Sequence, residues 1–165
     1  LSDNQHAWNL GRELPEALWS RLNGSNLSSC LGKAFVITSV DANGFPHAAL
    51  LSYGEVVAVG RSRLRMAMYE GSRSVAHLKT NGKLTLSLVE EGLAYYVKGS
   101  AAPIPAVPQY PRLARFEIRI EEILEDQTPE EEAGTRITGG ITFQPPKGDA
   151  ELLKSWEGVL SALRA

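Results

Sequence analysis

The chain is dominated by short segments in which apolar and polar residues alternate with a period of two, the pattern of a β-strand with one buried face. In the clearest of them Phe116, Ile118 and Ile120 alternate with charged residues, so one face of this strand is expected to be wet. Turn residues, such as those at 41–44, separate the segments. The expected strands cover residues 34–37, 46–52, 55–59, 64–69, 84–88, 93–100 and 115–121. Many short strands joined by turns predict a closed or nearly closed antiparallel barrel.

Three segments change to the period of an amphipathic helix. The first covers residues 13–22, and the second covers residues 72–80 with Ser72 as its expected N-cap. The third covers residues 149–164 with Asp149 as its expected N-cap. Its apolar stripe is too extensive to face water, so we expect it to pack against the barrel or across a dimer seam. The stripe consists of Leu152, Leu153, Trp156, Val159, Leu160 and Leu163.

The remaining stretches are expected to be connections. Residues 101–111 contain several prolines, which cannot donate hydrogen bonds to a neighbouring strand, so an irregular crossing is expected there. Residues 126–135 are acidic and polar, and we expect a solvated loop. We therefore predict a single domain over residues 1–165, with the barrel at about 30–145 and the first and last helices outside it.

Composition and charge fit one globular domain. The 165 residues are 43% hydrophobic and 22% charged, which is enough to build a core. The net charge of -2 gives no overall attraction to nucleic acid or to an anionic membrane. No apolar run is long enough to span a bilayer and residues 1–6 lack the order of a signal peptide, so a cytoplasmic location is expected. Cys30, the only cysteine, is expected to be a partly buried thiol, and no residue spacing suggests a metal site.

The segment at 66–88 is the most informative for chemistry, because a strand ends there and a helix begins. A helix start offers free backbone N–H groups to an anion, Ser72 and Ser74 add hydroxyl groups, and Arg73 can bind a phosphate through paired N–H groups. Three further arginines lie just upstream and could supplement this site, namely Arg61, Arg63 and Arg65. Local chemistry alone favours a simpler interpretation, in which the serine caps the helix and the arginine is a solvated surface charge.

Two motifs in sequence order carry a resemblance to a known family. The first is a strand, a hairpin turn and a return strand, with Thr38, Asp41, Gly44, Pro46 and His47 at the matching positions. The second is the turn Tyr69-Glu70-Gly71-Ser72-Arg73-Ser74, a helix, and an Asn81-Gly82 turn before the next strand. Together they resemble the pyridoxamine 5'-phosphate oxidase-like family of FMN-binding split barrels, over residues 33–100.

The resemblance implies a mainly β (α+β) fold, an antiparallel split β-barrel of about six strands with peripheral helices. It further implies a homodimer with FMN at the seam and a small-molecule redox substrate. Ser72 and Arg73 would hold the phosphate, with Ser74 beside them. The remaining cofactor-binding positions are His47, Ala48 and Ala49 against the flavin ring or ribityl chain, with Met68 and Tyr69 at the flanks. No side chain is assigned as an acid or base catalyst.

Several features depart from the family pattern. Ser74 stands where many relatives have lysine, and Met68 stands near a position that often carries a hydroxyl group. The carboxy-terminal Arg-Leu-x-Pro motif of true pyridoxamine 5'-phosphate oxidases is absent, which argues against vitamin B6 oxidation. Two alternatives therefore stand beside the FMN-dependent oxidoreductase. One is a non-catalytic module for haem, a deazaflavin or stored flavin, and the other is a cofactor-free interaction protein on the same fold.

Overall fold

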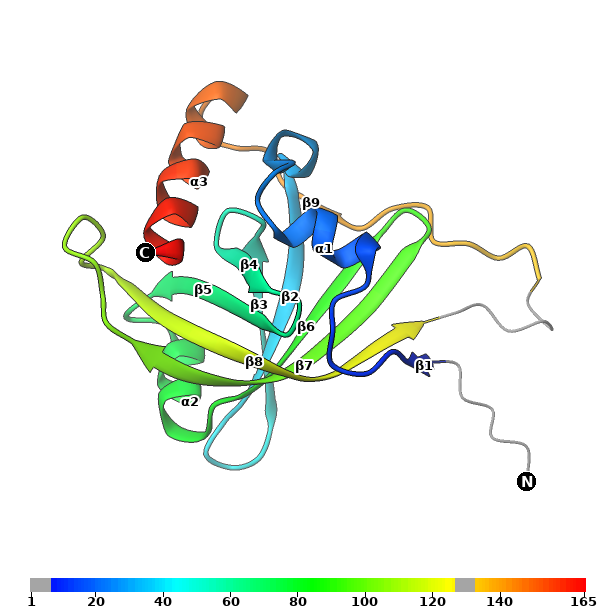
Figure 1. Ribbon diagram of the computed structural model, residues 1–165, viewed down its shortest axis with the longest axis horizontal. Coiled ribbons are helices and arrows are strands. Elements are labelled where there is room, and N and C mark those ends of the chain that lie inside the picture. Colours follow the sequence, from blue (N-terminus) through cyan, green and yellow to red (C-terminus); the bar gives the residue numbers. More distant parts are fainter. Residues whose placement is uncertain (1–6, 127–132) are drawn as a thin grey trace.

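A single antiparallel sheet forms the centre of the molecule, in the strand order β3-β2-β6-β7-β8-β5-β4 (Figure 1). The computed structural model describes residues 7–126 and 133–165. Two short strands extend this sheet, β1 beside β8 and β9 beside β2. The strands are β1 (Ala7–Asn9), β2 (Lys33–Val40), β3 (Pro46–Ser52), β4 (Val56–Gly60), β5 (Arg63–Tyr69), β6 (Lys83–Glu90), β7 (Leu93–Ile104), β8 (Leu113–Asp126) and β9 (Ile141–Thr142).

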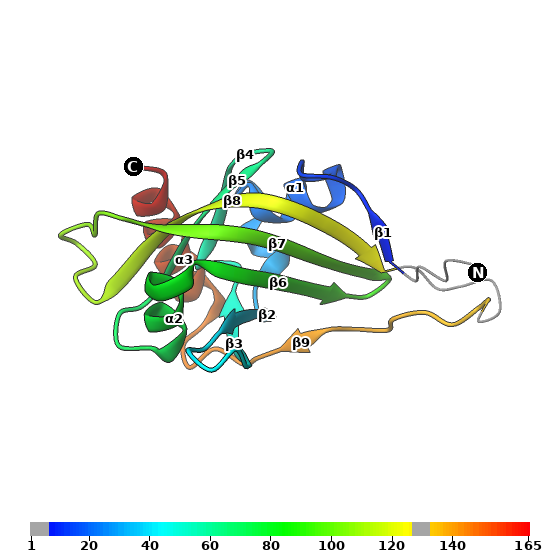
Figure 2. The ribbon, with the colours of Figure 1, turned by 90° about the horizontal axis from the view of Figure 1, so that it is seen from below.

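The barrel is split between β3 and β4. These strands follow each other in the sequence, yet they stand at opposite ends of the sheet order and do not pair with each other. Figure 2 shows the long strands β6, β7 and β8 side by side, curving around the core. The expectation of a mainly β split barrel with peripheral helices is confirmed.

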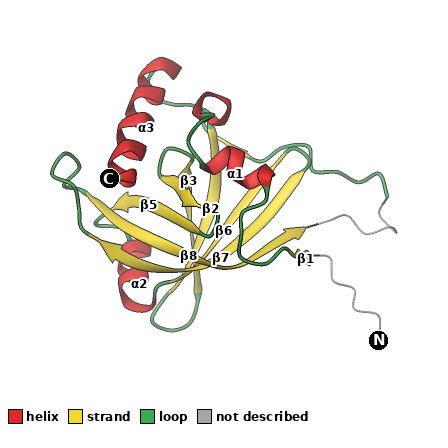
Figure 3. Ribbon diagram, in the orientation of Figure 1, coloured by secondary structure: helices red, strands yellow, loops and turns green. Residues whose placement is uncertain are grey.

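Helices cover the barrel on two sides (Figure 3). They are α1 (Glu16–Leu22), the 3-10 helix η1 (Leu27–Cys30), α2 (Arg73–Asn81) and α3 (Asp149–Arg164). In Figure 1, α2 lies on one side of the sheet, and α1 and α3 lie on the other. None of the helices in the described part of the chain is long and apolar enough to cross a membrane.

The alternating positions of the sequence build the core. Their apolar side chains point inward and are buried, including Phe35, Ile37, Leu64, Met66, Leu84, Leu86, Leu88, Phe116, Ile118 and Ile120. The stripe of α3 joins the same core, and its Trp156, Leu160 and Leu163 are buried. This helix therefore packs against the barrel, as expected. Its N-cap is Gly148, and Asp149 is its first residue, where a negative charge suits the helix dipole.

The expected irregular crossing begins later than the prolines suggested. β7 continues through Pro103 to Ile104, still paired with β8. Its pairing with β6 ends at Ser100, so the last residues of β7 have a strand on one side only. A proline there removes no hydrogen bond from the ladder. The expected loop at 126–135 lies mostly outside the described residues.

Arg115 was expected on the wet face of its strand, but it is 8% exposed. α3 covers this part of β8, and the Arg115 guanidinium donates to the carbonyl oxygen of Ala162 at 2.9 Å. Arg65 donates to the carbonyl oxygen of Leu163, also at 2.9 Å. Two cations thus bind carbonyl groups of the last turn of α3, which have no partner within the helix.

Candidate cofactor site

The first turn of α2 is built by its capping residue. Ser72 has extended backbone angles, and its hydroxyl accepts a hydrogen bond from the N–H of Val75 at 3.2 Å. The backbone N–H of Ser72 in turn donates to the carbonyl oxygen of Tyr69 at 3.0 Å, which fixes the end of β5 against the helix start. At the other end Gly82 has φ 69°, a left-handed conformation that glycine adopts without strain. The expected caps of this helix are confirmed.

Arg73 is exposed and forms no hydrogen bond or ion pair with the described residues, 7–126 and 133–165. The arginines expected to assist it are engaged elsewhere. Arg61 pairs with Glu16 and stacks on a tryptophan ring, Arg63 and Arg65 pair with Glu117 on β8, and Arg65 also holds α3. Of these four arginines, Arg73 is therefore the one whose side chain has no partner among the described residues.

β3 is an edge strand, paired among the described residues with β2 alone. Successive side chains alternate between its faces. His47 is opposite Ser39 and Ala49 is opposite Ile37, on the inward face. Ala48 is opposite Thr38 on the outward face and is exposed. A ligand on one face of β3 therefore meets His47 and Ala49 or Ala48, but not all three side chains.

His77 joins α2 to β3. Its ring lies 5.0 Å from the ring of His47, at an interplanar angle of 87°. Its Nδ1 lies 3.0 Å from the hydroxyl of Ser39, which is fully buried on β2. His77 follows Arg73 by one helical turn, so both lie on the same face of α2. The contact brings His47, on the predicted strand, to the helix that carries Arg73.

The other predicted site residues are dispersed around this helix start. Met68 is 4% exposed and points into the barrel core, so a ligand on the surface can meet its backbone but not its side chain. Ser74 is likewise buried, at 2% exposed, whereas Tyr69 is 60% exposed beside the turn. The sequence analysis did not select His77 or Ser39. The spacing of four residues between Arg73 and His77 is the signal that could have indicated the histidine.

The outward face of β3 and β2 carries apolar groups without cover from the described chain. Leu50 is 60% exposed and Phe45, in the preceding turn, is 67% exposed. Leu50 pairs across the strands with Val36, and Ala48 pairs with Thr38. This surface, which we call the outer face, combines small and apolar side chains next to the strand that carries His47.

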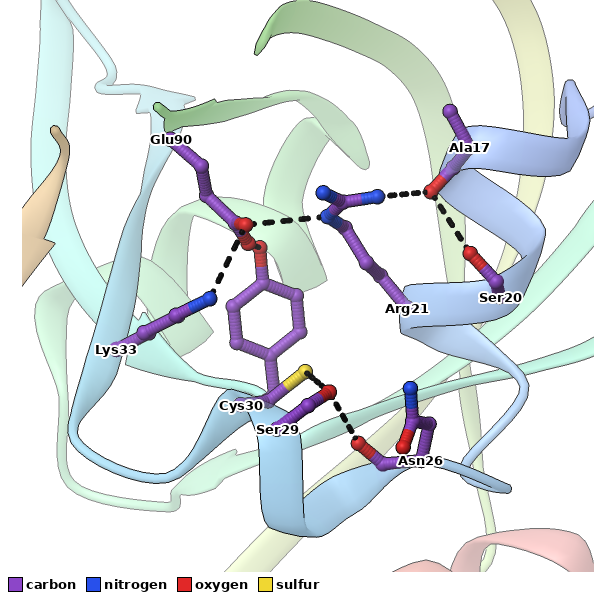
Figure 4. A network of polar contacts seen from close by, with 9 residues as sticks. Ala17, Ser20, Arg21, Asn26, Ser29, Cys30, Lys33 and Glu90 are labelled. Carbon is purple, nitrogen blue, oxygen red and sulfur yellow. Dashed lines mark hydrogen bonds and ion pairs between the residues drawn. The ribbon is translucent and has the colours of Figure 1, made fainter. Parts of the chain in front are cut away.

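A second polar cluster surrounds Glu90 at the far end of β6 (Figure 4). The Glu90 carboxylate accepts hydrogen bonds from the hydroxyl of Tyr53 at 2.5 Å, from Arg21 at 3.1 Å and from Lys33 at 3.3 Å. It lies seven residues, about 23 Å along the strand, from the start of β6, which directly follows the end of α2. Cys30 is fully buried nearby, and burial raises the pKa of its thiol.

The charges around Glu90 decide its ionisation. Burial acts to raise the pKa of Glu90, but the hydrogen bond from Tyr53 and the cations Arg21 and Lys33 outweigh it and hold this pKa below its ordinary value. Burial, reinforced by the same hydrogen bond, raises the pKa of Tyr53 far above its ordinary value. A pocket of about 390 Å³ opens beside the cluster. Because three donors already satisfy the carboxylate, we interpret the cluster as a structural junction between α1, β2 and β6.

Comparison with known proteins identifies the family of this chain. The family model described as pyridoxamine 5'-phosphate oxidase matches residues 32–139. An uncharacterized protein of Bacillus subtilis (strain 168), YclD, is 32% identical over 153 residues, which cover 92% of this chain and 96% of that protein. The chain belongs to the pyridoxamine 5'-phosphate oxidase family.

Solved structures share the fold at low sequence identity. An FMN-binding protein from Syntrophomonas wolfei subsp. wolfei is 15% identical, with a TM-score of 0.52 over 69% of this chain and 89% of that one. An F420 reductase is 13% identical, with a TM-score of 0.51 over 67% of this chain and 98% of that one. These similarities concern the barrel, so the cofactor of this chain must be argued from its own residues.

Proposed function

We propose that the protein binds FMN with the phosphate at the start of α2 and the flavin beside β3, in a site shared by two copies, and acts as an oxidoreductase on a small molecule. The observation that carries the proposal is Arg73, an exposed guanidinium without a partner among the described residues, beside the capping Ser72. Family membership and the FMN-binding relative from Syntrophomonas support it.

The residues at this helix start fit a phosphate group. The first turn of α2 leaves backbone N–H groups without partners in the helix, and its dipole favours negative charge. Arg73 can donate two parallel hydrogen bonds to phosphate oxygens. The nearest acid, Glu70, is occupied by an ion pair with Lys79. Among the described residues no carboxylate is therefore paired with Arg73. A ligand would not have to displace one.

The edge position of β3 suits the rest of the cofactor. Backbone groups along the open edge of a strand can bind a polar ring edge, and on either face of β3 a small side chain, Ala48 or Ala49, leaves room for a flat group. Bound flavin would supply the redox chemistry, because the barrel provides binding, orientation and electrostatics. Residues of this chain would hold the phosphate and exclude water from one side of the ring.

Absorbance spectra decide between this proposal and its rivals. We expect the purified protein, or the protein titrated with FMN, to show a flavin spectrum that shifts on binding. Saturation by haem or a deazaflavin but not FMN would point instead to another cofactor on the same fold. A colourless protein that binds none of the three would favour an interaction protein and contradict the proposal.

Arg73→Ala is expected to weaken FMN binding by about 1.5 to 3 kcal/mol, or about 10- to 150-fold in Kd, because it removes charge-assisted hydrogen bonds to the phosphate. Fluorescence titration measures this change. Arg119→Ala is the matched control, since Arg119 is an exposed arginine on β8 with an ion pair of its own. An unchanged Kd in the Arg73 variant would remove this residue from the site.

Leu50→Asp is expected to convert the dimer to a monomer and to reduce FMN binding with it. A stable dimer buries at least about 1,200 Å² in total, and a carboxylate in the apolar outer face would have to be buried without a partner. Light scattering at micromolar concentration measures the mass. Lys154→Asp, at an exposed position on α3, is the control for an added acid. A wild-type monomer that binds FMN would contradict the shared site.

A further inference from the structure

Two histidines and a buried serine form a cluster that the proposed site has not yet used. His77 on α2 contacts His47 on β3, with ring centroids 5.0 Å apart. Side chains on a helix point back towards its N-terminus, so the ring of His77 leans towards the turn that carries Arg73. His77 follows Arg73 by one helical turn, so the ring pair adjoins the face of α2 that carries Arg73.

Ser39 holds the two histidines against β2. The Ser39 hydroxyl donates to the carbonyl oxygen of His47 at 3.5 Å, and its oxygen lies 3.0 Å from Nδ1 of His77. This serine is fully buried, so it fixes the place of the His77 ring.

No carboxylate balances this pair in the described part of the chain. β2 faces His77 with the uncharged Ser39, and β3 faces it with His47. Asp41, at the end of β2, accepts hydrogen bonds from the backbone of its own turn. On α2 the nearest charges are Arg73 and Lys79, and Lys79 pairs with Glu70. A bound phosphate would supply the anion that the described residues do not place beside this pair.

We propose that His77 and His47 are phosphate-binding residues that supply, when protonated, a second positive charge beside Arg73. This inference rests on the proposed FMN site and adds a dependence on proton concentration to it. Affinity for a phosphate-bearing ligand should then rise as the pH falls through the range in which imidazoles titrate. Protonation of the phosphate itself, whose second pKa is about 6, removes negative charge from the ligand and lowers the affinity. The pH dependence should therefore be measured above that pH.

The test compares FMN with riboflavin, which lacks the phosphate, between pH 8.5 and 6.5. We expect FMN to bind about fivefold more tightly at pH 6.5 than at pH 8.5, because a protonated imidazole adds a positive charge beside the phosphate. Riboflavin affinity should not change with pH. This comparison uses the wild-type protein, so it does not depend on any variant folding.

Variants assign the effect to the cluster. His77→Gln should remove most of the pH dependence of FMN binding, and His77→Arg should give tight binding at both pH values because its charge is permanent. FMN that binds with the same affinity at both pH values, or a pH dependence that survives in both His77→Gln and His47→Gln, would overturn the inference while leaving the proposed function intact. Absence of FMN binding at every pH would overturn both.

Discussion

Trp156→Ala is expected to lower the free energy of unfolding by about 3 to 5 kcal/mol, because it empties a large buried volume. The indole of Trp156 is 6% exposed and lies on Gly54, where a Cβ atom would stand only 2.1 Å from its Cγ. The ring of Phe143 lies 6.4 Å from it on another side. The backbone at Gly54 and the ring of Phe143 thus both pack against this indole.

Urea unfolding followed by circular dichroism measures this loss, and Lys154→Ala on the exposed face of α3 should change stability by less than about 0.5 kcal/mol. A stability loss below about 1 kcal/mol in the Trp156 variant would mean that α3 is loosely attached in solution. Such a helix would be free for a partner, and the interaction-protein alternative would gain support.

Glu90→Ala is expected to destabilise the fold by about 1 to 3 kcal/mol, because a buried hydroxyl loses its acceptor while the two cations, with side chains 28% and 40% exposed, stay partly solvated. The change leaves the Tyr53 hydroxyl, which is 1% exposed, without its acceptor. It also leaves Arg21 and Lys33 without their shared carboxylate. Chemical denaturation gives the magnitude, and the exposed neighbour in Glu91→Ala serves as the matched control.

The pH dependence of Glu90 has a definite sign. Its pKa is lower in the folded state than the ordinary value of 4.5. The charged carboxylate therefore contributes its full stability above pH 4.5, and this contribution is lost as the pH falls through the lower, folded-state pKa. The stability difference between wild type and Glu90→Gln should be largest near neutral pH and should shrink below pH 4.5. A difference that grows on acidification would contradict the lowered pKa.

Much of the fold was predictable because the apolar alternation of this chain is regular. The strands at 84–88 and 115–121 and the stripe of α3 depend on the period of hydrophobic residues, and the core uses those positions. The extension of β7 through Pro103 was not predictable from local rules, since it depends on where β6 begins. Arg115 was misplaced for a similar reason, because its cover comes from a helix about 47 residues away in sequence.

The candidate site was predictable only in part. The caps of α2 follow from Ser72 and Gly82, which are local signals. The contact between His47 and His77 joins a strand and a helix that are separated in the sequence by the β4–β5 hairpin, so no sequence spacing indicates it. Glu90 looked like part of an ordinary turn, and the four groups that meet there come from α1, the β3–β4 turn, β2 and β6.

The position of Trp156 over Gly54 has a consequence for the order of events during folding. Gly54 lies in the turn between β3 and β4, the two strands that leave the barrel open, and α3 follows every strand of the barrel in the chain. During synthesis on the ribosome the whole sheet therefore emerges before residues 149–164 can cover this seam. The hydrogen bond from Arg65 to Leu163 spans 98 positions, a separation that slows closure. Until that contact forms, the apolar surface that α3 covers is exposed, and exposed core surface makes a partly folded chain prone to aggregate.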